Sequence, residues 1–126
     1  MLGDEKSNQP SPMNLIDSSH TQLLAKSMDA YSLRQKVTAT NIANADTPGY
    51  KRHEVYFEEA LNEAMQTSGM SGAKDTNPSI VVTDQNVILE EELIEQADTQ
   101  LRFQAVTKAL RHHYSLVRNG ITGTNR

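Results

Sequence analysis

The chain has 126 residues, which is enough for one small domain and too few for two. Its hydrophobic content of 37% and aromatic content of 5%, with no Trp, are low for a globular domain and favour a protein that completes its core with partners. The net charge of −4 without a clustered basic face argues against nucleic acid as the main partner, and the absence of Cys excludes disulfides, thiolate metal sites and cysteine nucleophiles.

The N-terminal end is predicted to be a flexible extension over residues 1–16. It contains Gly3, Pro10 and Pro12, and its apolar residues follow neither a helical nor a strand period. It lacks a basic start followed by an apolar run, so we expect no cleavable secretory signal. No stretch approaches the roughly 20 apolar residues that a membrane span requires. A protein of this kind that works outside the cytoplasm would leave by a route that does not read a cleaved signal.

Residues 17–126 are predicted to form a single unit that begins with a helix over residues 18–44. Asp17, Ser18 and Ser19 can cap its start. The residues that follow recur at alternating steps of four and three, which is typical of a helix that packs along another helix. This stripe consists of Leu24, Met28, Tyr31, Gln35, Thr38 and Ile42. Its apolar members are predicted to pack, and the polar positions 35 and 38 to fix the register and the choice of partner.

A sharp corner over residues 45–50 is predicted after this helix. Pro48 fixes its own φ and pushes Thr47 out of the helical region, while Gly49 tolerates the positive φ at the third position of a type II turn. The side chains of Asp46 and Thr47 can accept hydrogen bonds from local backbone amides. The whole motif comprises Asn41, Ile42, Ala43, Asn44, Ala45, Asp46, Thr47, Pro48, Gly49, Tyr50 and Lys51. A bare Pro-Gly pair alone would indicate only an ordinary helix-ending loop.

The middle of the chain is predicted to hold a short extended piece, a short helix and a loop. The basic triplet at 51–53 is interpreted as a solvated segment after the turn, and residues 53–57 favour an extended path. Helical spacing returns over residues 57–66 and ends at the glycines of the segment 67–72. Residues 67–86 are then predicted to be a flexible loop. It includes a β-branched run that favours a small strand or hairpin and a turn at 84–86.

A long helix over residues 87–118 is the clearest predicted element. Acidic residues near its start and basic residues near its end suit the helix dipole, and Asn119-Gly120 provides a stop. At about 1.5 Å per residue, roughly 30 residues span about 45 Å, so this helix must lie along another long helix of its own chain or of a neighbour. The predicted packing residues are Leu89, Leu93, Phe103, Leu110, Tyr114 and Val117, with Gln96, Gln100 and Thr107 at the polar positions of the stripe.

Catalytic constellations are scarce in this sequence. His112 and His113 are adjacent and point about 100° apart on a helix, so they cannot chelate one metal as an i, i+4 pair would. The run Glu90-Glu91-Glu92 splays around the helix axis and is interpreted as a solvated helix start. There is no Gly-rich phosphate loop and no nucleophile elbow. We therefore predict no catalytic residue, no metal, no cofactor and no small-molecule substrate.

The eleven-residue motif resembles the N-terminal signature of the axial family of flagellar rod, hook and filament-junction proteins. The likeness runs from about Leu24 through Arg52, and the segment 100–105 resembles the family's terminal helix less sharply. The short length and the lack of a large middle domain most resemble the rod proteins of the proximal kind. The resemblance implies a mainly α fold in which the N- and C-terminal helices pair as a coiled-coil-like layer, with the short helix, the Pro-Gly corner and the loop between them.

The same resemblance implies a structural subunit of the bacterial flagellar rod that transmits motor torque across the periplasm. The implied partners are other rod subunits in a homo- or hetero-oligomeric helical assembly, the rod-base adaptor, the membrane-ring proteins and the flagellar type III export apparatus. Two alternatives remain open from the residues alone. A free-standing helical adaptor in the cytoplasm would be a cooperatively folded monomer, and a metal-dependent enzyme would lose its metal when His112 and His113 are changed.

Overall fold

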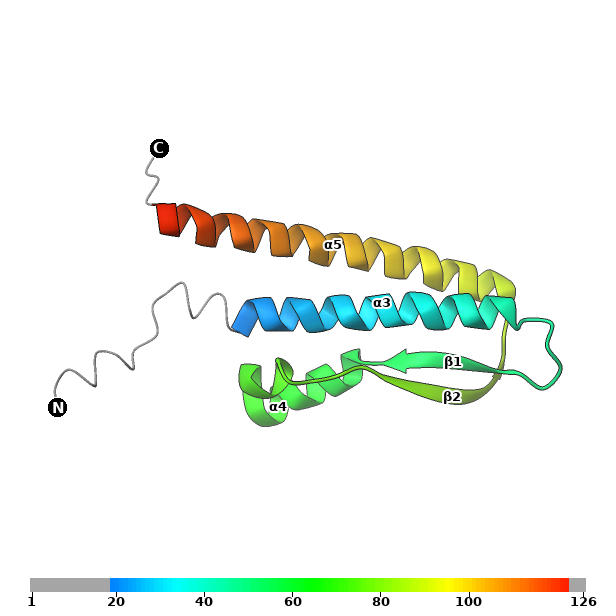
Figure 1. The fold of residues 1–126 in the computed structure, drawn as a ribbon. Coiled ribbons are helices and arrows are strands. Elements are labelled where there is room, and N and C mark those ends of the chain that lie inside the picture. Colours follow the sequence, from blue (N-terminus) through cyan, green and yellow to red (C-terminus); the bar gives the residue numbers. More distant parts are fainter. Residues whose placement is uncertain (1–18, 123–126) are drawn as a thin grey trace.

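The computed structural model describes residues 19–122. The described elements are α3 (Thr21–Ala43), β1 (Lys51–Tyr56), α4 (Glu58–Ala73), β2 (Ser79–Asn86) and α5 (Leu89–Thr122). Helix α3 lies in the middle, with α5 along one side and the β1–β2 pair and α4 along the other (Figure 1). The predicted mainly α fold with two long paired helices is thus confirmed. The predicted extension over residues 1–16 lies outside the described residues, as do Asp17 and Ser18.

Ser19, one of the three predicted capping residues, does not cap helix α3. Residues 19–20 already form a helical turn of the π type, and His20, which precedes α3, makes no capping hydrogen bond through its side chain. Ser19 is therefore not in the extended conformation that a capping serine needs, and its prediction as a cap is wrong. At the other end the backbone N–H of Asn44 donates to the carbonyls of Thr40 and Asn41, which ends the helix close to the predicted residue.

The two strands form an antiparallel pair although a helix lies between them in the chain. Val55 pairs with Ile80 and His53 with Val82, and a bulge separates the His53 pair from the pairing of Lys51 with Asn86. The predicted turn at 84–86 is wrong because the bulge lets these residues continue the ladder. The Lys51 ammonium donates to the Asn86 side chain over 3.0 Å, which holds this far end of the pair.

Helix α4 is longer than the predicted helix over residues 57–66. It continues to Ala73 and bends at Gly69, which has φ 62° and ψ −149°, a conformation that glycine adopts without steric cost. A Cβ on Gly72 would lie 2.7 Å from the Cβ of Ser68, so this glycine allows close packing inside the bend. The regular helical backbone therefore breaks at Gly69, within the segment where the sequence predicted a break, but helical residues resume after it and reach Ala73.

Helix α5 also runs past its predicted end. It begins at Leu89, two residues after the predicted start, and continues through Asn119 and Gly120 to Thr122. A glycine stops a helix when it adopts the left-handed conformation. Among the described glycines only Gly49 and Gly69 have a positive φ, so Gly120 stays helical.

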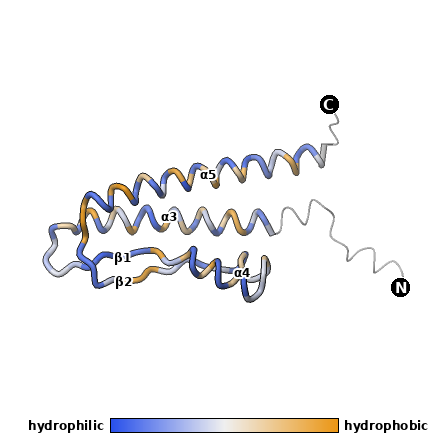
Figure 2. The backbone as a smooth tube through the Cα atoms, turned by 180° about the vertical axis from the view of Figure 1, so that it is seen from behind, coloured by the Kyte–Doolittle hydropathy of each residue, from blue (hydrophilic) through white to orange (hydrophobic). Residues whose placement is uncertain are grey.

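The apolar core is small and lies between α3 and the β1–α4 side of the molecule. Its buried side chains are Ala30, Val37, Val55 and Phe57, with Leu33 and Leu61 packed against them. Hydrophobic and hydrophilic residues alternate along α5 (Figure 2), and the leucines of its first turns lie outside this core. The other buried side chains of this region are polar or charged, namely Arg34, Thr38, Asn41, Glu92 and Thr99.

Candidate assembly site

The predicted corner is present at Pro48-Gly49. Gly49 has φ 78°, and the backbone N–H of Tyr50 donates to the carbonyl of Thr47 over 3.2 Å. This is the hydrogen bond that closes a β-turn with Pro48 and Gly49 at its centre. The predicted positive φ at Gly49 is confirmed.

The predicted role of Asp46 and Thr47 in the corner is wrong. The Thr47 hydroxyl donates to the Asn44 side chain over 3.1 Å, and the Asn44 amide donates to the Thr40 carbonyl over 2.9 Å. The backbone N–H of Thr47 is already taken by the Asn44 carbonyl at 3.0 Å. That donor is therefore not left for a side-chain cap, and within residues 19–122 the Asp46 carboxylate receives no hydrogen bond.

Asn41 joins α3 to β1. Its side chain donates to the carbonyl of His53 over 2.7 Å and accepts from the backbone N–H of the same residue over 3.0 Å. The Tyr50 hydroxyl also donates to it over 3.4 Å, and the Tyr50 ring stacks on His53 with centroids 5.0 Å apart. Asn41 is fully buried. Its amide therefore pairs with the inner edge of β1 as the backbone of a third strand would.

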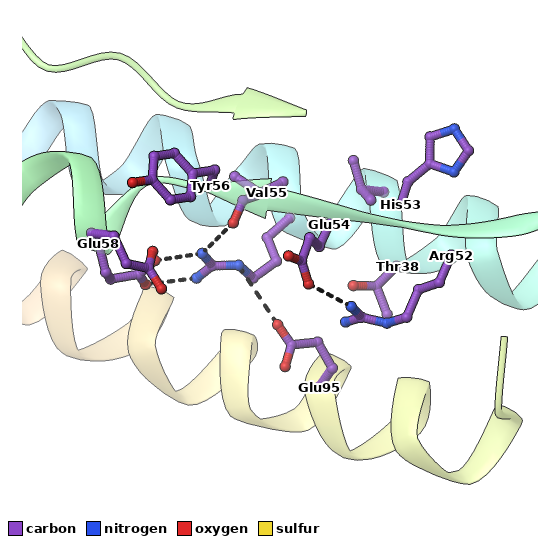
Figure 3. Close-up of a pocket in the computed structure, with 11 residues that line it drawn as sticks. Thr38, Arg52, His53, Glu54, Val55, Tyr56, Glu58 and Glu95 are labelled. Carbon is purple, nitrogen blue, oxygen red and sulfur yellow. Dashed lines mark hydrogen bonds and ion pairs between the residues drawn. The ribbon is translucent and has the colours of Figure 1, made fainter. Parts of the chain in front are cut away.

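Arg34, which lies about two turns before Asn41 on α3, binds the same edge of β1. Its guanidinium donates to the carbonyl of Val55 over 3.1 Å and to both carboxylate oxygens of Glu58 over 2.8 and 2.6 Å, and it lies 3.6 Å from Glu95 of α5 (Figure 3). The hydrogen bond with Glu58 raises the pKa of the Arg34 guanidinium, and the same bond lowers the pKa of the Glu58 carboxyl. The ion pair thus favours the charged form of both partners.

Glu92 ties α5 to the other two layers. Its carboxylate accepts from the Asn41 amide over 3.1 Å and from Arg52 Nε over 2.5 Å, and the residue is fully buried. Arg52 also donates to Glu54 over 2.8 Å. Burial lowers the pKa of Arg52, but the hydrogen bond with Glu92 helps to raise it above its ordinary value on balance.

We call these six residues the polar cluster: Arg34, Asn41, Arg52, Glu58, Glu92 and Glu95. The cluster connects α3, β1, α4 and α5 beside a cleft of about 190 Å³. Its two cations hold three carboxylates, and its amide is bonded on both sides, so the arrangement is suited to clamping elements together. The described residues contain no group of three side chains placed to hold a metal ion.

The sequence reasoning missed this cluster. Glu92 was interpreted as part of a solvated helix start and Arg52 as part of a solvated segment, and both interpretations are wrong because the two side chains pair inside the fold. A signal was available in the spacing. Buried polar residues recur at steps of four and three on α3, at 34, 38 and 41. On α5 the buried polar residues 92 and 99 are seven apart, with the half-buried Glu95 between them.

The predicted packing residues divide into two groups. Leu24, Met28, Tyr31, Ile42, Phe103, Leu110 and Val117 are half-buried. Leu89, Leu93 and Tyr114 are 44%, 49% and 55% exposed, so within this chain they pack little, and their packing against other subunits stays a prediction. The predicted polar positions Gln35 and Gln100 meet, because the Gln35 amide donates to Gln100 across α3 and α5 over 2.5 Å.

The rest of the motif lies at the surface of the corner. Ile42, Asn44, Ala45 and Tyr50 are half-buried, and the exposed members are Ala43, Asp46, Thr47, Pro48, Gly49 and Lys51. The corner therefore combines one buried anchor with an exposed loop.

None of the helices in the described part of the chain is long and apolar enough to cross a membrane.

Comparison with known proteins adds independent findings. The family described as Flagella basal body rod protein matches residues 25–51, which cover most of α3 and the corner. The flagellar basal body rod protein FlgB of Borrelia hermsii is 31% identical over 131 residues, covering 83% of this chain and 96% of that protein. FlgB of Bacillus subtilis is 28% identical over 121 residues, covering 81% and 92%. FlgB of Escherichia coli is 54% identical over 33 residues, about a quarter of each chain.

Proposed function

The chain belongs to the FlgB family of flagellar basal body rod proteins, and from this premise we propose that it forms part of the proximal rod in the periplasm and transmits motor torque there. It is a structural subunit of the rod, at the flagellar basal body. The clamping of the corner is the observation that supports this proposal. Asn41, Arg34 and Glu92 fix the direction in which the chain leaves α3, so a load on the exposed loop passes directly into the paired helices.

The chain assembles with other components of the flagellar rod, as its family membership implies. We infer that the rod-base adaptor and the membrane-ring proteins are among its neighbours, and that the flagellar type III apparatus exports it without cleavage of a signal peptide. The exposed corner at 46–49 and the exposed leucines of α5 are the surfaces available for such contacts. The motif residues 41–51 and the ten predicted packing residues are proposed as the assembly site.

The family is not known for enzymatic activity, and we propose that this subunit has no catalytic role, no cofactor and no small-molecule substrate. Both cations of the polar cluster are engaged by carboxylates, which supports a structural use of its charges. We further propose that residues 17–126 act as one unit, because the polar cluster joins all three layers of the described part. The similarity to rod proteins does not favour the alternative of a cytoplasmic adaptor.

The proposal is tested by deletion and complementation in the bacterium that carries this chain. Cells without the gene are expected to lack rods and to be non-motile, and a tagged full-length copy is expected to restore swimming and to co-purify with basal bodies. The same cells carrying Asn41→Ala measure the contribution of the anchor, with Asn62→Ala as the matched control at an exposed position of α4 outside the proposed assembly site. A tagged chain that restores swimming but stays in the cytoplasm would contradict the rod assignment and favour the adaptor.

A further inference from the structure

Helix α5 has one side without a partner. It lies against α3 on one side, and no other described element covers its opposite side (Figure 1). Apolar side chains remain exposed along its first turns: Leu89 is 44%, Leu93 49%, Ile94 69% and Leu101 66% exposed. A row of exposed leucines on a surface helix indicates a contact that a single chain does not supply.

The charges of α5 divide it into a shorter acidic stretch and a longer basic stretch, which we call the acidic half and the basic half. Residues 89–98, the acidic half, contain Glu90, Glu91, Glu92, Glu95 and Asp98 and no cation. Residues 99–118, the basic half, contain Arg102, Lys108, Arg111 and Arg118 and no carboxylate. Glu92, Glu95 and Asp98 are paired with arginines of the same chain. No ion pair within residues 19–122 involves the exposed Glu90 and Glu91 or the exposed Lys108, Arg111 and Arg118.

The basic half also has room for apolar side chains. A hollow of about 250 Å³ lies among Phe103, Thr107 and Arg111, and a second of about 230 Å³ lies among Arg111, Tyr114 and Arg118. Lys108 lines the first hollow as well. The basic half thus presents two shallow hollows with cations at their edges, and the acidic half presents leucines flanked by free carboxylates.

Helical geometry places these complementary features on the same side of α5. Eighteen residues make five turns at 3.6 residues per turn, so Lys108 projects in the direction of Glu90, and Arg111 in the direction of Leu93. A shift of about 18 residues, or roughly 27 Å along the axis, brings the acidic half of one helix beside the basic half of another.

We propose that the acidic half of α5 docks on the basic half of α5 in a second copy of this chain, with the two helices parallel and offset by about five turns. This inference rests on the proposed function. An antiparallel pair would also match the charges, but it uses both halves at once and closes as a dimer. The parallel offset leaves one acidic and one basic half free, so a further copy can add, as a growing rod requires.

Charge reversal tests the contact in solution. The full-length double variants Glu90→Lys with Glu91→Lys, and Lys108→Glu with Arg111→Glu, are each expected to weaken self-association by at least about tenfold, because like charges then face each other. An equimolar mixture is expected to associate again, because each variant keeps the half that the other needs. Sedimentation velocity in low and high salt measures these species. Failure of the mixture to recover would overturn the proposal, and recovery rules out loss of folding as the cause.

Cysteine cross-linking tests the register and the polarity. The chain contains no Cys, so Glu90→Cys with Lys108→Cys introduces the only thiols. Within one helix these positions lie about 27 Å apart, while a disulfide needs Cα atoms within about 7 Å. The parallel offset predicts a ladder of disulfide-linked oligomers under mild oxidation, with dimers at most from an equimolar mixture of the two single variants. A product that stops at the dimer in the double variant, or no product at all, would overturn the proposal.

The cross-linking is done in cells, and purified basal bodies are analysed on non-reducing gels. A chain that is present in basal bodies without a ladder overturns this contact and leaves the rod function standing. A chain that is absent from basal bodies, although soluble and folded, overturns the proposed function, and a ladder in solution would still support the contact.

Discussion

Asn41 stands where a third strand would lie beside β1. A two-stranded sheet is at most marginally stable alone, and its inner edge would leave backbone groups of β1 without partners under α3. Asn41 bonds both backbone groups of His53, and Arg34 bonds the carbonyl of Val55. Two side chains of one helix therefore complete the sheet on that side, because buried backbone groups need hydrogen-bond partners.

Replacing Asn41 with Ala is expected to destabilise the fold by roughly 2–3 kcal/mol, since the backbone groups of His53 lose their side-chain partner and Glu92 loses one of its two. The control Asn44→Ala removes an exposed bond to the Thr40 carbonyl and is expected to cost less than about 1 kcal/mol. Urea unfolding followed by circular dichroism, at one protein concentration, measures both. Equal destabilisation by the two changes would contradict the anchoring role of Asn41.

Replacing Gly49 with Val is expected to abolish rod assembly while export continues. A Cβ at this position meets no atom within 4 Å, so the cost of about 1–2 kcal/mol comes from the left-handed backbone alone. Gly49→Asn is the control, because asparagine adopts this conformation more readily. Swimming and the amount of chain in the periplasmic fraction are measured together. Normal swimming of the valine strain would show that the corner tolerates another path.

At the scale of elements, the sequence predicted what periodicity and turn chemistry encode. The residues that recur at steps of four and three predicted α3 and α5, and the Pro48-Gly49 pair predicted the corner. The predicted end of α5 was wrong because Gly120 lacks the positive φ with which a glycine stops a helix. Gly69 has a positive φ and interrupts α4, but helical residues resume beyond it. The polar cluster was missed because Glu92 reads as a surface residue until Arg52, 40 residues away, is placed beside it.

The ion pair between α3 and α4 makes stability depend on pH. The pKa of Glu58 is lowered from its ordinary 4.5 by Arg34, so its contribution is complete above the unfolded value and is lost as pH falls through the lower folded value. The difference in unfolding free energy between the wild type and Glu58→Gln is therefore expected to shrink as pH falls below about 4.5. Thermal melts across acidic pH measure it. A difference in unfolding free energy that stays constant across acidic pH would contradict a stabilising Arg34–Glu58 ion pair.

The α3–α5 contact is tested at Leu110. This half-buried residue lies 18 residues after the buried Glu92, hence on the same side of α5. Leu110→Asp is expected to cost about 1–3 kcal/mol and to prevent incorporation into basal bodies, because it places a charge at the helix interface. The exposed Ala39→Asp on α3 adds the same charge away from this interface and from the docking face of α5, and should be incorporated. Equal tolerance in a basal-body pull-down would mean that Leu110 is not packed.

For the whole molecule, the interior sets a limit on independent stability. Four apolar side chains form the buried core, while five polar or charged ones share the interior. Burial of apolar area is the main favourable term in folding, and buried ion pairs add little net stability over apolar packing. Most of the stability that the long helices need must therefore come from neighbouring subunits, which agrees with a rod subunit.

The isolated chain is accordingly expected to melt over a broad temperature range, with a midpoint that rises with protein concentration. Circular dichroism melts at several concentrations measure this, and the charge-reversal variants of α5 serve as controls that should melt independently of concentration. A sharp melt at the same temperature in every sample would show that a single chain completes its own core.

The mixture of guanidinium, amide and carboxylate inside this fold also affects its thermal response. Unfolding raises the heat capacity when apolar surface becomes hydrated and lowers it when polar surface does. Unfolding exposes the polar side chains of Arg34, Asn41 and Glu92. Their hydration offsets part of the heat-capacity increase that comes from exposing Val37, Val55 and Phe57. The curve of unfolding free energy against temperature is then flatter than for a domain with an apolar interior. Cooling and warming therefore act on this subunit chiefly through the surfaces that it shares with its neighbours.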